Sequence, residues 1–343
     1  MMADGAAAAT SDLRDRLQTW LRTVRGPAAV VSALKQYPSG FSWITNGFRL
    51  EMAGSPSEDL ILRLRPSNGL YAPYSAEPEF AALAAMQGTP VSAPAPRHWS
   101  DDPSILGHPF LIVDKAPGEA PIPWGKDDGL SDERRTALGE QFADALGHLH
   151  AIDWQTTGLA RFGDGLTVEN AALRQVEDWQ TNYRRWAMRP HPMLHRVFGW
   201  LKANAPVAPR LSIVHGDYRL GNFLEVDGRI TAILDWELTH LGDPHEDLAW
   251  TCLPQYRGGT PLMSKLVSRE DLYQRHQAIC GFEITESSMR YYTLFSLVKL
   301  AVTHIAAAYA FERSGFHDLR MPAMATQIAP TLRQIEKMVE ADQ

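Results

Sequence analysis

Apolar residues in the first 116 positions follow two different periods. Between residues 13 and 24 they recur every three or four positions, which predicts an amphipathic helix capped by Thr10 or Ser11. Between residues 33 and 65 they form short runs separated by Gly, Ser and Pro, which predicts a meander of three strands. Two further elements follow, a helix at Glu77 to Met86 and an apolar run at Leu111 to Val113. This part of the chain is therefore predicted to be a small, mostly β lobe.

The remainder of the chain carries mostly helical periodicity. Ser131 begins a long predicted helix that runs to about Ile152. Five later segments show the same period: Glu169 to Met188, Leu194 to Ala203, Asp271 to Cys280, Thr285 to Glu312 and Met324 to Glu340. The Pro-rich segment from Pro117 to Pro123 separates the two parts. We therefore predict an α+β fold of two domains, a β-rich N-lobe at residues 1–116 and a larger, mostly helical C-lobe at residues 117–343.

One β-hairpin interrupts the helical part. Asp227-Gly228 is a strong two-residue turn signal, because both positions tolerate positive φ and apolar residues alternate on either side. Counting back from that turn pairs Asn222 with Ile233 and puts Asp235 diagonally across from Asn222. The two side chains would then share a face, with their backbones roughly 7 Å apart, and could converge on one hard cation.

Composition and charge narrow the function classes. At 343 residues, with 45% hydrophobic and 21% charged residues, the chain can bury a core large enough for two lobes. Its net charge of -7 provides no basic field, so we do not expect nucleic acid as a partner. Two cysteines, Cys252 and Cys280, are too few for a disulfide framework or a zinc site, which fits a reducing compartment.

We expect no membrane partner. Residues 1–10 lack the basic and long apolar segments of a signal peptide. The most apolar stretch, residues 294–311, is interrupted by Lys299 and His304 and is typical of a buried helix. The expected protein is soluble and cytoplasmic, either a monomer or a homodimer.

The segment HGDYRLGN, followed by the hairpin, carries the candidate chemistry. Asp217 and Asn222 are separated by four residues, and Asp235 follows at the far end of the hairpin. Phosphoryl transfer needs these groups in this order: a carboxylate that accepts the proton of an attacking hydroxyl, then an amide and a second carboxylate that hold Mg²⁺ on the nucleotide phosphates.

The chain resembles the aminoglycoside phosphotransferase and choline kinase superfamily, whose fold is similar to that of protein kinases. The resemblance rests on the HGDxxxxN loop, from His215 to Asn222, and on the ILDWE strand end, from Ile233 to Glu237. It implies that Asp217 is the catalytic base or hydroxyl-orienting residue. It also implies that Asn222 and Asp235 are Mg²⁺ ligands and that ATP is the phosphoryl donor.

The same resemblance implies a cation on the third strand and a glutamate on the following helix. The run LILRLR offers Arg63 or Arg65 where a lysine is usual, and Arg63 matches the family pattern best. Arginine can contact phosphate with two N–H groups, unlike a point-charge ammonium. Glu79 is the expected partner of this cation.

Two weaker resemblances complete the nucleotide site. The loop from Pro38 to Trp43 aligns with the phosphate-covering loop of these kinases and offers the Ser42 hydroxyl, although it lacks the GxGxxG pattern. The segment from Val113 to Ala116, which includes Lys115, corresponds to the hinge where adenine hydrogen-bonds the backbone.

The neighbouring polar residues have simpler explanations. Asp243 and Glu246 match the N-cap and N3 positions of a capping box. Asp247 resembles the buried acid that braces the catalytic loop in kinase-like folds. His215 is expected to orient that loop, and His150 to be an ordinary hydrogen-bonded helix residue.

The sequence predicts a small-molecule hydroxyl as the phosphoryl acceptor. The pattern from Asp178 to Trp186 looks like that of the kinase-like domain fused to some acyl-CoA dehydrogenases, which implies a hydroxylated acid or its CoA ester. An aminoglycoside antibiotic is the alternative acceptor. Aromatic residues at helical spacing, from Trp179 to Trp200, are expected to pack in the core, although they could also line an acceptor site.

Two other function classes stay open from the sequence. A metal-dependent phosphohydrolase would gather two metals with histidine ligands, from the set His215, Asp217, Asp235, Asp243 and His245. A non-catalytic pseudokinase would bind a nucleotide without turnover, and the arginine in place of lysine is its only support.

Overall fold

The computed structural model describes residues 2–37, 42–123 and 129–340. The chain divides into two compact units: unit 1 comprises Met1–Phe80 and Pro94–Lys115, and unit 2 comprises Ala81–Ala93 and Ala116–Gln343. Residues 81–93 thus group with unit 2, where the backbone N–H of Ile233 donates to the carbonyl of Ser92 at 2.8 Å. The domain boundary after residue 116 stays a prediction.

Unit 1 is built on a five-stranded antiparallel sheet with strand order β1-β2-β3-β5-β4. The strands are β1 Val30–Gln36, β2 Ile44–Glu51, β3 Glu58–Leu64, β4 Pro96–Ser100 and β5 Phe110–Asp114. The predicted three-strand meander is confirmed as β1-β2-β3. Strand β4 was not predicted, because its sequence PRHWS is polar and does not alternate.

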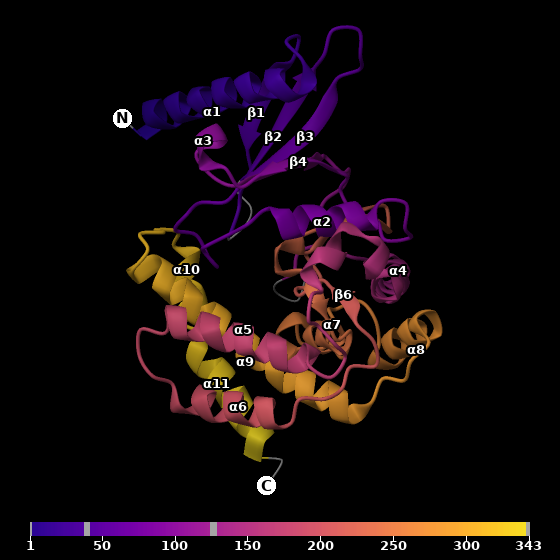
Figure 1. Ribbon diagram of the computed structural model, residues 1–343. Helices are drawn as coiled ribbons and strands as arrows, with labels where there is room; N and C mark the ends of the chain where they lie inside the picture. Colours follow the sequence, from indigo (N-terminus) through magenta and orange to yellow (C-terminus); the bar gives the residue numbers. More distant parts are fainter. Residues whose placement is uncertain (1, 38–41, 124–128, 341–343) are drawn as a thin grey trace. The chain divides into compact units, whose positions relative to one another are not determined.

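Helix α1, Met2–Arg25, covers one face of this sheet (Figure 1). Leu17 and Leu21 of α1 are fully buried against alternate residues of β3, including Leu62. Since side chains alternate along a strand, Arg63 lies on the opposite face of the sheet from α1. The predicted cap at residue 10 or 11 is wrong: the helix begins at Met2, because the preceding alanines have high helix propensity.

Two short helices complete unit 1. Helix α2, Glu77–Met86, has the predicted bounds, and its first residues belong to unit 1. Helix α3, Pro103–Leu106, is capped by Asp102, whose side chain accepts from the N–H of Ser104 at 2.8 Å.

Unit 2 is mostly helical, as predicted. Its helices are α4 Asp132–Ala151, α5 Ala171–Trp186, α6 Pro192–Ala203, α7 His245–Thr251, α8 Arg269–Cys280, α9 Glu286–Glu312, α10 Arg320–Ala325 and α11 Ile328–Glu340. Four short 3₁₀ helices, η1 Trp154–Thr156, η2 Gly158–Phe162, η3 Trp236–Leu238 and η4 Pro254–Tyr256, connect them. The single helix predicted at residues 324–340 is therefore two helices in the structure, α10 and α11.

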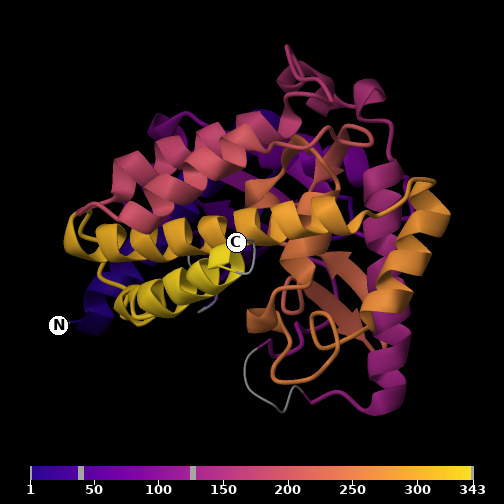
Figure 2. The same ribbon diagram turned by 90° about the horizontal axis from the view of Figure 1, so that it is seen from below.

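Helix α9 is the central element of unit 2. It packs against α5, α7, α10 and α11, and Figure 2 shows α5 on one side of it and α11 on the other. By length and composition alone, α9 could cross a membrane, but 89% of its most apolar window is buried inside the structure. A single helix of this kind is weak evidence for a membrane span, because core helices of soluble proteins have the same properties.

Two small antiparallel pairs of strands carry the candidate site. Strand β6, Ser212–Val214, pairs with β9, His240–Gly242, and β7, Phe223–Val226, pairs with β8, Arg229–Ile233. The predicted hairpin turn is confirmed, with positive φ at both Asp227 and Gly228. The predicted register is wrong by one residue: an irregularity in the pairing puts Phe223 opposite Ile233. The backbone carbonyl of Asn222 instead accepts from the N–H of Leu234 at 2.8 Å.

The packing of α1 on the sheet generates a stability prediction. Leu21→Ala should lower the free energy of unfolding of unit 1 by about 2–5 kcal/mol, because it opens a cavity under the helix. Val24→Ala, on the same helix but 44% exposed, should change it by no more than about 0.5 kcal/mol. Urea unfolding followed by circular dichroism measures both. Equal midpoints for the two variants would contradict this account of the core.

Candidate active site

The loop between β6 and β7 is organised by His215, which is fully buried. Its Nε2 donates to the carbonyl of Leu234 at 2.8 Å, and its Nδ1 accepts from the backbone N–H of Asp217 at 3.1 Å. Burial lowers the pKa of His215, so the ring is neutral and the two partners define one tautomer. Both ring nitrogens are engaged, so the predicted orienting role is confirmed, and His215 has no lone pair left for a metal.

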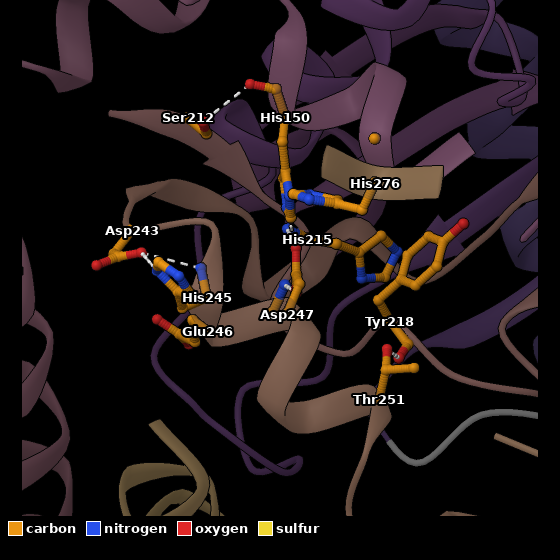
Figure 3. A network of polar contacts seen from close by, with 12 residues as sticks. His150, Ser212, His215, Tyr218, Asp243, His245, Glu246, Asp247, Thr251 and His276 are labelled. Carbon is orange, nitrogen blue, oxygen red and sulfur yellow. Dashed lines mark hydrogen bonds and ion pairs between the residues drawn. The ribbon is translucent and has the colours of Figure 1, made fainter. Parts of the chain in front are cut away.

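A second buried group, Asp247 of α7, braces the same loop. Its Oδ2 accepts from the backbone N–H of His215 at 2.7 Å, and its Oδ1 accepts from that of Gly216 at 2.8 Å. His150 of α4 donates to Oδ2 at 3.1 Å, and Figure 3 shows the His150 ring meeting the Asp247 carboxylate, while the His215 ring points away from it toward Tyr218. Burial alone would raise the pKa of Asp247, but the contacts with His150 and His215 together outweigh it and lower that pKa. The predicted brace is confirmed.

Asp217 lies at the end of this braced segment, with its side chain 17% exposed. Oδ1 accepts from Arg219 Nε at 2.9 Å and from Trp250 Nε1 at 2.7 Å, and Oδ2 accepts from Asn222 Nδ2 at 2.7 Å. Three donors therefore fix the direction of the carboxylate. An ionised carboxylate has about four acceptor positions, so one stays available for the proton of a substrate hydroxyl.

Asn222 and Asp235 are the candidate cation ligands. The Asn222 amide nitrogen donates to both the backbone and the side chain of Asp217, at 2.8 and 2.7 Å, so its oxygen is the atom that can bind a cation. Asp235 follows β8 in the left-handed region, with φ of 63°, which ends the alternation of the strand. These two oxygen donors suit Mg²⁺, which usually takes one or two protein ligands and completes its shell with water and phosphate. Within the described residues, no group of three His, Cys, Asp or Glu side chains could hold a metal ion.

In unit 1, the carboxylate of Glu79 in α2 pairs with two arginines, Arg63 in β3 and Arg65 directly after this strand. Arg63 forms an ion pair with it, and Arg65 Nη2 lies 3.5 Å from its second oxygen. Arg65 is nearly inaccessible, and its guanidinium lies between the rings of Trp43 and Tyr74, 4.0 and 4.3 Å from their centroids. Arg63, with 14% exposure against 5% for Arg65, is the more accessible cation and the one predicted from the sequence.

The remaining predicted nucleotide residues also lie in unit 1. Ser42 is buried, and residues 38–41 of the predicted phosphate loop lie outside the described residues. Val113 is buried in β5, between β3 and β4. The side chain of Lys115 is exposed, but its backbone N–H donates to the carbonyl of Asp59 at 3.1 Å. The backbone N–H of Lys115 therefore cannot donate to an adenine while it is bonded to the carbonyl of Asp59.

The predicted capping box at the start of α7 is wrong. Asp243 does accept from the N–H of His245 at 2.9 Å, but Glu246 does not cap the helix. Its carboxylate accepts from Lys299 at 2.8 Å and from His240 at 3.1 Å. Burial disfavours the charge of Glu246, but these partners outweigh it and lower its pKa to about 2. A tertiary ion pair thus replaces the local cap.

The metal-dependent phosphohydrolase hypothesis loses His215 as a ligand, and within the described residues no group of three His, Cys, Asp or Glu side chains could hold a metal ion. Both nitrogens of His215 are engaged, and His245 Nδ1 donates to Asp243 at 2.7 Å as a separate pair. The sequence analysis did not identify three residues that hold Asp217 and the loop between β6 and β7, namely Arg219, Trp250 and Lys299. Lys299 was visible as a lone charge inside an apolar helix, a signal that was used only to exclude a membrane span.

Comparisons with known proteins identify the family and the fold of the chain. The sequence profile described as APH, Phosphotransferase enzyme family, matches residues 42–279. Acyl-CoA dehydrogenase family member 10 of Mus musculus is 32% identical over 251 residues, 71% of this chain. The chain spans 22% of the length of that relative.

Solved structures share the fold. A Ralstonia eutropha structure assigned to the aminoglycoside phosphotransferases has a TM-score of 0.73 and 23% identity, with 95% of this chain and 98% of that chain covered. A thermostable mutant of aminoglycoside phosphotransferase APH(4)-Ia, in a ternary complex with ADP and hygromycin B, has a TM-score of 0.55 and 17% identity, with 94% and 97% covered. The predicted kinase-like α+β fold is thus confirmed. The chain belongs to the phosphotransferase enzyme family.

Proposed function

We propose that this protein transfers the γ-phosphoryl group of ATP to a hydroxyl of a small molecule, in a magnesium-dependent reaction. The observation that carries the proposal is the fixed carboxylate of Asp217, which three donors orient while one acceptor position stays available. Phosphoryl transfer depends on positioning and on charge neutralisation, and it requires little covalent chemistry from the protein. In this proposal the rigidly held carboxylate of Asp217 supplies the positioning, and the two Mg²⁺ ligands supply the charge neutralisation.

Each residue has a distinct role in this proposal. Asp217 aligns the acceptor hydroxyl and receives its proton as the oxygen attacks the phosphorus atom. Asn222 and Asp235 would hold Mg²⁺, whose charge neutralises the phosphate oxygens. Arg63 contacts the nucleotide phosphates, and Glu79 fixes the direction of the guanidinium. The ADP complex of the similarly folded APH(4)-Ia supports an adenine nucleotide as donor.

We propose a hydroxylated carboxylic acid or its CoA ester as the acceptor. The support is the 32% identity to acyl-CoA dehydrogenase family member 10, together with the segment from Asp178 to Trp186. The name of that relative describes a protein of which this chain covers 22% of the length. An aminoglycoside is the competing acceptor, supported by the fold neighbours.

The acceptor is testable with a defined panel. The protein, Mg²⁺ and ATP are incubated with hydroxylated fatty acids, hydroxyacyl-CoA esters, aminoglycosides and simple phosphomonoesters, and products are identified by mass spectrometry. We expect one phosphoryl group to be added to a hydroxyacyl compound and an equal amount of ADP to be released. Phosphorylated aminoglycosides would overturn the acceptor assignment. Hydrolysis of phosphomonoesters with no phosphoryl addition would overturn the proposed reaction.

The role of Asp217 is testable with the acceptor identified in this panel, or with slow Mg-ATP hydrolysis. Asp217→Asn keeps the shape of the side chain but removes its charge and basicity. We expect turnover to fall by about 10²–10⁴-fold, because general-base catalysis contributes about that much. Mg-ATP binding, measured by isothermal titration calorimetry, should change by less than about threefold, since the variant keeps both proposed metal ligands.

The matched control is Asp227→Asn at the hairpin tip. Asp227 is exposed and its φ of 50° is readily adopted by asparagine, so turnover should stay at the level of the unmodified protein. Near-normal turnover in a folded Asp217→Asn protein would rule out the proposed role.

A further inference from the structure

Lys299 is a cation in the middle of the apolar helix α9, and it is only 1% exposed. An unpaired ammonium group in a protein interior costs several kcal/mol, so its partners determine why it is tolerated. One partner is the Glu246 carboxylate, 2.8 Å from Nζ. His240 donates to the other oxygen of Glu246 at 3.1 Å. The Glu246 carboxylate neutralises the buried charge of Lys299. An apolar Leu or Met at residue 299 would need no counter-charge at all.

The second partner of Lys299 is the catalytic loop itself. Its Nζ donates to the carbonyl of Gly216 at 2.6 Å. That carbonyl belongs to the same planar peptide group as the N–H of Asp217, which donates to His215 at 3.1 Å. Both ends of this peptide group are therefore held. Gly216 has a φ of 86°, a left-handed conformation that glycine adopts without strain, and its own N–H donates to Asp247.

Lys299 also contacts the residue that holds the Asp217 side chain. Its Nζ lies 4.9 Å from the ring centroid of Trp250, within the range of a cation–π interaction. The indole N–H of Trp250 donates to Asp217 Oδ1 at 2.7 Å. One buried ammonium group thus contacts the backbone on one side of Asp217 and an aromatic donor to its carboxylate on the other.

We propose that Lys299 is a positioning residue: through the peptide between Gly216 and Asp217 and through the Trp250 ring, it sets the direction of the Asp217 carboxylate. The expected effect of Lys299 on turnover rests on the proposed phosphoryl transfer. The expected effect of Lys299 on the geometry of Asp217 is independent of that proposal. Lys299 touches neither substrate nor nucleotide in this account. It acts through the residues that it holds.

A purely structural role for the buried ion pair predicts a different behaviour. Removal of Lys299 alone would leave the Glu246 charge buried and would destabilise the fold whatever its role. The double variant Lys299→Met with Glu246→Gln removes both charges and keeps both side-chain volumes close to the original. Under a purely structural role, the folded double variant would have normal turnover, because the fold no longer needs the pair.

The first measurement is steady-state turnover of the double variant, with the acceptor found in the panel or with Mg-ATP hydrolysis. We expect kcat to fall by about 10²-fold, since a misplaced catalytic group costs about that much, while KM for Mg-ATP stays within about twofold. The control is Thr293→Val on the same helix. The Thr293 hydroxyl donates to the carbonyl of Met289 at 2.7 Å, within the helix itself, so its loss should leave kcat unchanged.

The second measurement does not depend on activity. Two-dimensional ¹H–¹⁵N NMR resolves indole N–H groups, and Trp250→Phe assigns the Trp250 resonance. In the unmodified protein this resonance should be shifted by its carboxylate acceptor and slow to exchange with water. In the double variant it should move and exchange faster.

The outcomes separate the two proposals. An unchanged Trp250 resonance in a folded double variant overturns the role of Lys299, whatever the turnover. Faster exchange of the Trp250 indole N–H with water in the double variant supports that role, whereas a shifted resonance with unchanged exchange follows from the lost charge alone and overturns it. An unmodified protein that consumes no Mg-ATP with any compound of the panel overturns the proposed function, and the NMR result still decides the question of Lys299.

Discussion

The two hydrogen bonds from the loop between β6 and β7 to the Asp247 carboxylate are the constraint on which the candidate site depends. They satisfy the backbone N–H groups of His215 and Gly216, which are otherwise buried without acceptors. Each such orphaned group would cost about 1–3 kcal/mol. Because Asp247 also accepts from His150, the loop is tied to α7 and α4 at once. The polar groups of unit 2 are thus arranged around one buried carboxylate that itself takes no part in the proposed chemistry.

Everything else at the site refines the direction of Asp217. His215 and Lys299 fix the backbone before it, and Trp250 and Asn222 fix its side chain. The arrangement joins residues from the loop between β6 and β7, from α7 and from α9, so no single element determines the geometry. This explains how a carboxylate that is only partly buried can hold one orientation without substrate.

Sequence reasoning predicted the parts of the fold that local pattern determines. The long helix after Ser131 and the Asp227-Gly228 turn follow from capping and turn chemistry, and both are confirmed. The order of Asp217, Asn222 and Asp235 indicated phosphoryl transfer without any knowledge of distances. The register of the hairpin was wrong, because a local irregularity shifts the pairing and no residue type announces it.

Long-range contacts were the part that the sequence could not provide. Glu246 has the right spacing for a capping box, yet a lysine 53 residues away takes its carboxylate. Similarly, Arg63 and Arg65 are alike in sequence, and their exposure and the stacking of Arg65 on Tyr74 distinguish them. In both cases tertiary burial overrides a local rule, because the energy of pairing a buried charge exceeds that of a surface cap.

The most direct test of the central claim is a crystal structure of the protein with Mg²⁺ and a non-hydrolysable ATP analogue. We expect a cation bound by the Asn222 side-chain oxygen and the Asp235 carboxylate, in contact with the phosphates, with Asp217 still held by Trp250. A cation on His245 or Asp243 instead, or a nucleotide whose phosphates contact neither Asn222 nor Asp235, would contradict it.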